Sequence, residues 1–230
     1  MERRIIVSVI GNAASTNPEH PTAYKTKWEL SFELGKALID HGFRVLSGGG
    51  RGVMRAVFAG AHASKKYREG DTIAITPSYG METANDFADI VIPTGLDLAR
   101  NQIVANSQVV VAIGGGSGTL NEISNAWKMG RLVIAYKNAD GWSKKLANNP
   151  IDECVRYPNM DDRIWGVESA EEVIKVIKEK LPLYNRVFDR IPYGIPRLKK
   201  QVPSNWVGPV KIPDDPFKIK PLSIIEPQEN

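Results

Sequence analysis

The strongest constraint on the fold is a regular alternation between short β-branched runs and longer segments of helical periodicity. Continuous apolar runs, such as those at 4–11 and 108–116, are typical of strands that are covered on both faces. Apolar residues recur at helical spacing within 22–41, and Gly42 ends that segment. This βαβα order predicts an α/β fold with a doubly wound parallel sheet that is flanked by helices on both faces.

The same alternation defines the expected elements. Strands are expected at 4–11, 43–50, 72–77, 89–95, 108–116 and 131–137, with a last edge strand at 163–167. Helices are expected at 22–41, 53–67, 96–107, 119–129 and 170–181, with a short amphipathic piece at 142–147.

Composition excludes several classes of protein. The net charge is +4 and the basic residues are spread along the chain, which disfavours a nucleic-acid-binding protein and favours an anionic ligand. The single cysteine, Cys154, excludes an intrachain disulfide and a cysteine-rich zinc site, and we expect no metal. Residues 1–11 run directly into a strand without a signal-peptide pattern, and no segment reaches the length of a membrane span. We therefore expect a cytoplasmic protein that binds neither membranes nor nucleic acids.

Two glycine-rich loops follow predicted strands: SGGGRGVM at 47–54 and GGGSGT at 114–119. In parallel α/β sheets, ligands bind beyond the carboxyl ends of the strands, where such loops lie. Glycine lets another group approach the backbone closely, and a helix N-terminus offers amide donors to a phosphate. Tight turns alone would explain one such loop, but two loops on neighbouring strands at one sheet edge favour phosphate binding.

Neither loop has the lysine of a P-loop, nor GxGxxG with an acidic residue ending the next strand, which disfavours a nucleoside triphosphatase and an ordinary NAD enzyme. The predicted phosphate-binding residues are Gly11, at the end of the first strand, together with Gly48, Gly49, Gly50, Gly115, Gly116, Ser117, Gly118 and Thr119.

Glu122 lies one turn into the helix that follows the second loop. The spacing Thr119-x-x-Glu122 matches a capping box, in which the glutamate bonds back to the helix start, and spacing alone favours this role. The alternative is a carboxylate that faces a ligand over the loop. A position near a helix N-terminus favours its ionised form, which suits stabilising a cationic sugar or orienting water rather than general acid catalysis. Arg100 either reaches the same edge or lies on the surface near a helix start.

Two stretches together resemble the LOG-like Rossmann-fold proteins, long mislabelled lysine decarboxylases: IPTGLDLARNQIVANSQVVVAIGGGSGTLNEI at 92–123 and SGGGRGVMRAVFAGA at 47–61. This family includes cytokinin-activating phosphoribohydrolases and molybdenum-cofactor carrier proteins. The resemblance covers about 4–181, and both loops match in order and spacing. It implies a Rossmann-like fold and at least a homodimer.

The phosphoribohydrolase members carry the motif PGGxGTxxE and an upstream arginine. They cleave the N-glycosidic bond of a nucleoside 5′-monophosphate and release the base and ribose 5-phosphate. The resemblance places the loop at Gly115, Gly116, Gly118 and Thr119, and it implies catalytic roles for Arg100 and Glu122. An anionic Glu122 would stabilise the positive charge that develops on the ribose, and Arg100 would hold a phosphate or the leaving base.

The chain departs from that motif in three places. Gly114 stands at the leading proline, Asn101 stands at a usual lysine, and the first loop is one residue shorter. These features are more similar to the branch that contains the cofactor carriers and predicted nucleotide-binding proteins. We therefore predict binding of a phosphorylated nucleotide-like ligand, as in a molybdenum-cofactor carrier, with a nucleoside 5′-monophosphate phosphoribohydrolase as the alternative. Neither function requires a cofactor, and the ligand would be a nucleoside monophosphate or molybdenum cofactor.

Composition changes at Pro182. From there to Asn230 the chain carries nine of its fifteen prolines, which lack an amide donor and fix φ, so a central strand or a helix is disfavoured. Large apolar residues such as Trp206 and Phe217 need a surface to cover them. We expect a Rossmann-like phosphate-binding domain at 1–181 and an extended proline-rich arm at 182–230, packed on the body or on a neighbouring subunit of a homo-oligomer.

Overall fold

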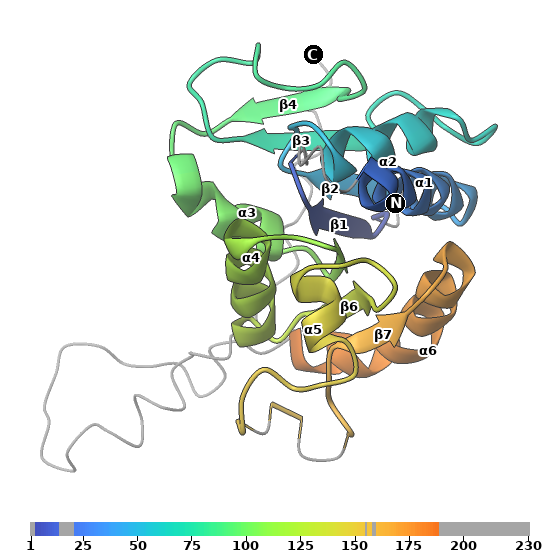
Figure 1. Cartoon of the computed structure of the whole chain (residues 1–230), viewed down its shortest axis with the longest axis vertical. Helices are drawn as coiled ribbons and strands as arrows, with labels where there is room; N and C mark the ends of the chain where they lie inside the picture. Colours follow the sequence, from blue (N-terminus) through green and yellow to red (C-terminus); the bar gives the residue numbers. More distant parts are fainter. Residues whose placement is uncertain (1–2, 14–20, 155, 158–159, 189–230) are drawn as a thin grey trace, which may run out of the picture. The chain divides into compact units, whose positions relative to one another are not determined.

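The structure of the protein, a computed structural model, describes residues 3–13, 21–154, 156–157 and 160–188 (Figure 1). The chain divides into two units, Met1–Tyr184 and Asn185–Asn230, and the expected arm beyond residue 188 lies outside the described residues. The elements in chain order are β1 (Ile6–Gly11), α1 (Pro21–Asp40), β2 (Arg44–Ser47), α2 (Val53–His62), β3 (Thr72–Thr76), β4 (Ile90–Pro93), η1 (Asp97–Arg100), α3 (Asn101–Ala105), β5 (Val109–Ile113), α4 (Ser117–Lys128), β6 (Leu132–Tyr136), α5 (Trp142–Leu146), β7 (Trp165–Val167) and α6 (Ala170–Phe188).

The strands of the described residues form one parallel sheet with the order β4-β3-β2-β1-β5-β6-β7. The predicted α/β fold and its parallel sheet are therefore confirmed. The chain winds outward from β1 to the edge strand β4 and then returns to place β5 on the other side of β1. This reversal creates a switch point between β1 and β5, where parallel α/β sheets bind their ligands.

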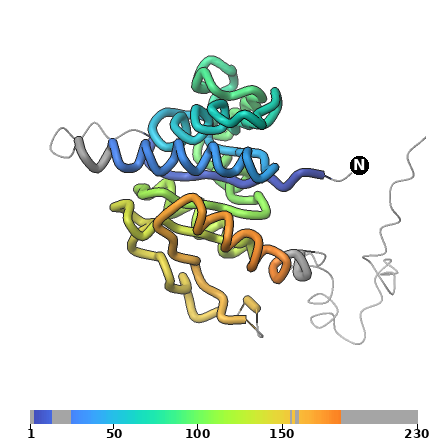
Figure 2. The backbone as a smooth tube through the Cα atoms, turned by 90° about the vertical axis from the view of Figure 1, so that its right-hand side faces the viewer, coloured from blue at the N-terminus to red at the C-terminus, as the bar shows by residue number. Residues whose placement is uncertain are grey.

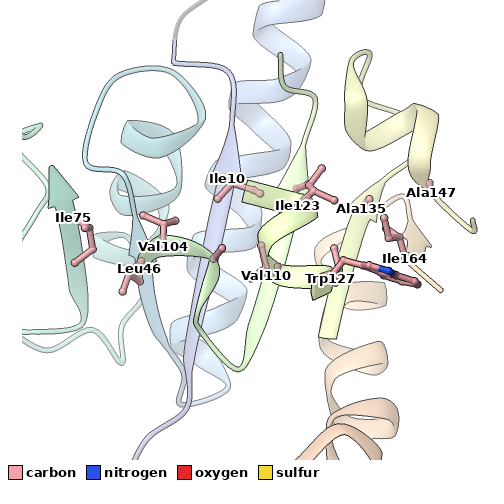
Figure 3. Close-up of a cluster of buried hydrophobic side chains, with 14 of the residues drawn as sticks. Ile10, Leu46, Ile75, Val104, Val110, Ile123, Trp127, Ala135, Ala147 and Ile164 are labelled. Carbon is pink, nitrogen blue, oxygen red and sulfur yellow. The ribbon is translucent and has the colours of Figure 1, made fainter. Parts of the chain in front are cut away.

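Helices cover both faces of the sheet, which is why the central strands are apolar along their whole length. All five residues of β5 are buried. Val110 points into a cluster that includes Val104 of α3 together with Ile123 and Trp127 of α4 (Figure 3). On the opposite face α1 and α6 lie on the same side (Figure 2). Burial on both faces explains the continuous apolar runs in the sequence.

We had expected the two glycine loops to follow neighbouring strands, but they do not. The first loop follows β2 and the second follows β5, and β1 lies between these two strands. The loop after β1, which begins at Asn12, therefore stands between the two glycine loops. Physically, the error arises because strand order in a doubly wound sheet differs from sequence order on either side of the switch point.

Several helix boundaries also differ from the prediction. The segment 96–107 divides into the short helices η1 and α3, and α2 already ends at His62. Helix α6 continues beyond Leu181 to Phe188 with Pro182 inside it. Pro182 and Lys178, whose carbonyl lacks an amide donor from Pro182, are exposed residues of this helix, while Leu181 and Tyr184 are buried. Within the described part of the chain, no helix combines the length and apolar composition that a bilayer crossing needs.

Candidate functional site

A cavity of about 310 Å³ opens at the carboxyl ends of β1, β2 and β5, beside the switch point of the sheet. Each of these strands contributes its carboxyl end or the loop that follows it: Gly11 ends β1 and is followed by Asn12, Gly48 follows β2, and Gly116–Gly118 follow β5. Met54 and Leu98 add apolar surface. The cavity is therefore built by three loops that the sheet brings together, not by the two glycine loops alone.

The turn after β5 is rigidly held on both sides. Gly114 and Gly115 have φ values of 64° and 100°, a backbone conformation that favours glycine. The amide of Gly114 donates to Oγ of Ser143 and the amide of Gly115 donates to Oδ1 of Asn12, each at 2.8 Å. The turn carries the chain from the buried strand directly to the start of α4 at the cavity.

Gly116 and Gly118 have no comparable structural requirement. A Cβ added at either position would meet no heavy atom within 4 Å among the described residues, and neither φ is positive. Gly116 is the N-cap of α4 and provides no side-chain cap. The first amides of a helix have no acceptor within the helix, so those of Ser117, Gly118 and Thr119 remain available at the cavity. Such amides and the helix dipole favour an anion.

Glu122 does not form the capping box that its spacing favours. Helix α4 begins at Ser117, two residues before the predicted start, so Thr119 lies inside the helix and cannot be its N-cap. The carboxylate of Glu122 instead lies in the cavity and accepts a hydrogen bond from Arg100, with 2.9 Å between Oε1 and Nη1. The side chains of Arg100 and Glu122 are only 15 % and 9 % exposed, so the ion pair is largely withdrawn from solvent.

Gly48 makes room for the guanidinium group of Arg100. A Cβ at position 48 would stand 2.7 Å from both Nη1 and Nη2 of Arg100, so the guanidinium group could not keep its present position beside a larger residue. The first loop therefore acts in this cavity mainly by admitting an arginine from η1. Nε of Arg100 is buried without a hydrogen-bond partner among the described residues. The guanidinium thus keeps a donor that Glu122 does not use.

Burial controls the protonation of Glu122. Withdrawal from solvent raises the pKa of Glu122 to about 7, while the charge and hydrogen bond of Arg100 act in the opposite direction. The helix N-terminus was expected to favour the ionised form of Glu122, and desolvation by burial acts against that form. Near neutral pH, Glu122 has access to both protonation states, which is a property of residues that transfer protons.

The structure brings most of the predicted site residues to this one cavity. Those that line it are Gly11, Gly48, Arg100, Gly116, Ser117, Gly118, Thr119 and Glu122. Gly49, Gly50 and Gly115 do not line it. A Cβ at Gly49 would stand 2.7 Å from Cβ of Ala74, and the carbonyls of Gly49 and Gly50 each accept a hydrogen bond from Nδ2 of Asn85 at 2.9 Å.

The two side chains that hold the turn after β5, those of Asn12 and Ser143, were not predicted. The side chain of Asn12 accepts a hydrogen bond from the amide of Gly115. The backbone carbonyl of Asn12 accepts another, at 3.0 Å, from the amide of Val53 at the start of α2. Its position directly after Gly11 was a signal that could have identified it. Ser143 fixes Gly114 from α5, and nothing in the sequence around it indicates that contact. The described residues contain no group of three or more His, Cys, Asp or Glu side chains placed to hold a metal ion.

The sheet, its switch point and the glycine-rich turn that leads into α4 define a Rossmann-type α/β protein. Residues 4–173 match the SLOG cluster4 family, and the chain belongs to this family. The resemblance to LOG-like proteins that was predicted from the two loops is thereby confirmed.

Proteins with two different descriptions are similar to this chain. The cytokinin riboside 5′-monophosphate phosphoribohydrolase of Mycobacterium tuberculosis is 34 % identical, over 64 % of this chain and 83 % of that protein. The molybdenum cofactor binding protein of the phototrophic bacterium Rippkaea orientalis has a TM-score of 0.61 and 31 % identity, over 77 % of this chain and 98 % of that chain. The molybdenum cofactor carrier protein of Chlamydomonas reinhardtii has a TM-score of 0.58 and 27 % identity, over 78 % and 99 %.

Proposed function

We propose that the protein binds a phosphorylated, nucleotide-like ligand in the cavity at the switch point. The phosphate would lie against the first amides of α4, with Arg100 as the neighbouring cation. The observation that carries this proposal is the open space above Gly116 and Gly118, where no steric or conformational requirement for glycine exists. A ligand that approaches the backbone at this point supplies the missing reason for glycine.

The charges around the cavity support an anionic ligand. Arg100 has a buried Nε without a partner in the described part of the chain, and the α4 N-terminus adds partial positive charge. The volume of about 310 Å³ lies at the lower end of ligand sites, enough for a sugar phosphate. Relatives described as molybdenum cofactor binding and carrier proteins add support for a protein that binds and carries a ligand.

Thermal unfolding in the presence of ribose 5-phosphate, AMP and inorganic phosphate tests this proposal. A ligand that binds only the folded state stabilises it by RT ln(1 + [L]/Kd), so the melting temperature rises with the logarithm of ligand concentration once that concentration exceeds the dissociation constant. Gly118→Ala is the informative variant, because alanine in the first turn of α4 meets no atom and is a better helix former than glycine. We expect its unliganded stability to be equal or higher, while its ligand affinity falls about tenfold, or roughly 1.4 kcal/mol.

Two outcomes would contradict the proposal. Unchanged melting temperatures with all three ligands would remove the phosphate site altogether. Equal affinities of wild type and Gly118→Ala would show that the ligand binds elsewhere. Ser124→Ala, at an exposed position of α4 that lines neither the cavity nor its neighbour, is the matched control.

Hydrolysis of a nucleoside 5′-monophosphate is the second candidate function. It is favoured by the position of Glu122, whose carboxylate faces the cavity and Arg100 instead of capping its helix. In this reaction the N-glycosidic bond breaks, its electron pair leaves with the base, and water adds to C1 of the ribose. Ionised Glu122 would stabilise the cationic sugar and accept a proton from the attacking water. The products are the free base and ribose 5-phosphate.

Chromatography of reaction mixtures with AMP distinguishes the two candidates. Release of adenine by wild type and its loss in Glu122→Gln, with AMP still bound, would identify the enzyme. Tight binding without release of base would identify a carrier. Glu122→Gln keeps the shape and a hydrogen-bond acceptor for Arg100, so it removes the charge with the least change in geometry.

A further inference from the structure

A second cavity of about 420 Å³ adjoins the first across the start of α4. The two cavities share Leu98, Asn101, Ser117 and Gly118 as lining residues. Any ligand whose phosphate lies at Ser117 and Gly118 therefore has its remaining atoms within reach of this second space.

The second cavity is lined by carboxamides and by no charged side chain. Asn101 and Gln102 come from α3, and Asn121 and Asn125 come from successive turns of α4. Burying a charged ring here would leave its charge without a counter-ion, which is costly, whereas an uncharged polar ring can form hydrogen bonds. Leu98, which is 72 % exposed, adds an apolar surface that suits the face of such a ring.

Hydrogen bonds within this wall fix the orientation of its amides. Nδ2 of Asn101 and Nδ2 of Asn125 both donate to Oδ1 of Asn121, at 3.1 and 3.2 Å. Both donors point at the same oxygen. Three groups therefore remain without a hydrogen-bond partner among the described residues: the side-chain carbonyl oxygens of Asn101 and Asn125 and the amide nitrogen of Asn121. These three side chains thus offer a ligand the amide donors of Asn121 and the carbonyl acceptors of Asn101 and Asn125, in orientations fixed by the two hydrogen bonds.

We propose that this second cavity recognises the heterocycle of the ligand, an uncharged purine-type or pterin-type ring whose edge carries adjacent hydrogen-bond donors and acceptors. This inference rests on the proposed function, because it needs a phosphate in the first cavity to place the ring in the second. Asn121 then determines ligand specificity, since it orients both neighbouring amides and presents its own donor. The carboxamide side chains of the second cavity determine which ring is preferred, while the start of α4 binds the phosphate that all candidate ligands share.

Affinities for a panel of phosphates test this assignment. AMP and GMP supply purine rings, 6-hydroxymethylpterin phosphate supplies a pterin ring, orotidine 5′-monophosphate supplies a negatively charged ring, and ribose 5-phosphate has no ring system. We expect at least one purine or pterin ligand to bind about fivefold to tenfold tighter than ribose 5-phosphate. Orotidine 5′-monophosphate should have no such advantage.

Asn121→Ala is the decisive variant, because this residue is exposed and lies outside the hydrophobic core. We expect it to abolish most of the advantage of the ring-bearing ligand while the affinity for ribose 5-phosphate stays within twofold of wild type. Ser124→Ala, at an exposed position of the same helix that lines neither cavity, should preserve both affinities. A Gly118→Ala variant should weaken all bound ligands alike, because it acts on the phosphate.

The results separate this inference from the function on which it rests. Equal affinities for ribose 5-phosphate and for every ring-bearing ligand, all weakened by Gly118→Ala, would overturn the ring subsite and leave phosphate binding in place. An unchanged advantage of the ring-bearing ligand in Asn121→Ala would also overturn it. Failure of every ligand to bind would overturn both.

Discussion

The carboxylate of Glu122 is bonded to Arg100, which lies 22 positions earlier in the chain, and not to the start of its own helix. This contact joins η1 to α4 across the cavity. An anionic ligand near Arg100 would compete with Glu122 for the same guanidinium group. Protonation of Glu122 would remove its negative charge and with it this competition. Ligand affinity and the protonation state of Glu122 are therefore coupled.

The first prediction concerns stability as a function of pH. Burial raises the pKa of Glu122 to about 7 from an ordinary 4.5, which applies to the unfolded chain. Between these values the folded protein binds the proton more tightly, so the stabilising contribution of Glu122 is complete below about 4.5 and is lost as the pH rises through about 7. We expect the unfolding free energy of wild type, relative to Glu122→Gln, to fall by roughly 3 kcal/mol over this range.

Denaturant unfolding of both proteins at a series of pH values measures this difference. Glu33→Gln, which removes a carboxylate from an exposed position of α1, serves as the control. Parallel stability curves for wild type and Glu122→Gln would show that Glu122 titrates identically in the folded and unfolded chain, contrary to its burial.

The sequence predicted the sheet better than the site. Continuous apolar runs such as 108–116 identify buried parallel strands because a strand covered on both faces has no polar side. The ion pair between Arg100 and Glu122 could not be derived from spacing, because a local capping box fits the same residues. The residue at which α4 begins decides between the ion pair and the capping box. Its start at Ser117 could not be predicted, because the glycines around it are poor helix formers.

The contacts that hold the glycine turn depend on tertiary structure for the same reason. Asn12 and Ser143 are far from Gly114 and Gly115 in the sequence, and they meet the turn only after the sheet places β1 beside β5 and α5 beyond it. Glycine indicates that a turn is unusual, but it does not indicate what satisfies its amides.

The second prediction concerns Gly48. A Cβ at this position would stand 2.7 Å from both terminal nitrogens of Arg100, so Gly48→Ala must displace the guanidinium group and disturb its hydrogen bond to Glu122. We expect a loss of about 1–3 kcal/mol in unfolding free energy. In an Arg100→Ala background the same substitution meets no guanidinium and should cost much less. A double-mutant cycle measures this coupling, and additive effects of the two substitutions would contradict the steric explanation.

The third prediction separates the two roles of Asn12. Asn12→Ala leaves the amide of Gly115 without its acceptor and should cost about 1–3 kcal/mol of stability. Asn12→Asp keeps an acceptor oxygen for that amide but adds a negative charge to the lining of the cavity. We expect near-normal stability with about tenfold weaker binding of ribose 5-phosphate at low ionic strength. Equal destabilisation by both variants, with phosphate affinity unchanged in Asn12→Asp, would contradict this division.

The fourth prediction is a homo-oligomer that uses the α3 side of the sheet. Ile90 and Ile92 of the edge strand β4 pair in register with Ile73 and Ile75, whose side chains face the core cluster. Their own side chains, pointing to the same side, are 42 % and 46 % exposed. Ile103 of α3 is 43 % exposed. Exposed large apolar side chains of this kind are typical of a surface that is covered in an assembly.

Light scattering of wild type should give at least twice the mass of one chain. Ile92→Lys combined with Ile103→Lys should shift the protein toward monomer, because two charges cannot be buried in an apolar interface without partners. Leu183→Lys is the matched control, since Leu183 is also 43 % exposed but lies on α6, away from β4 and α3. A monomeric wild type, or equal effects of the control and the double variant, would show that this surface has no role in assembly.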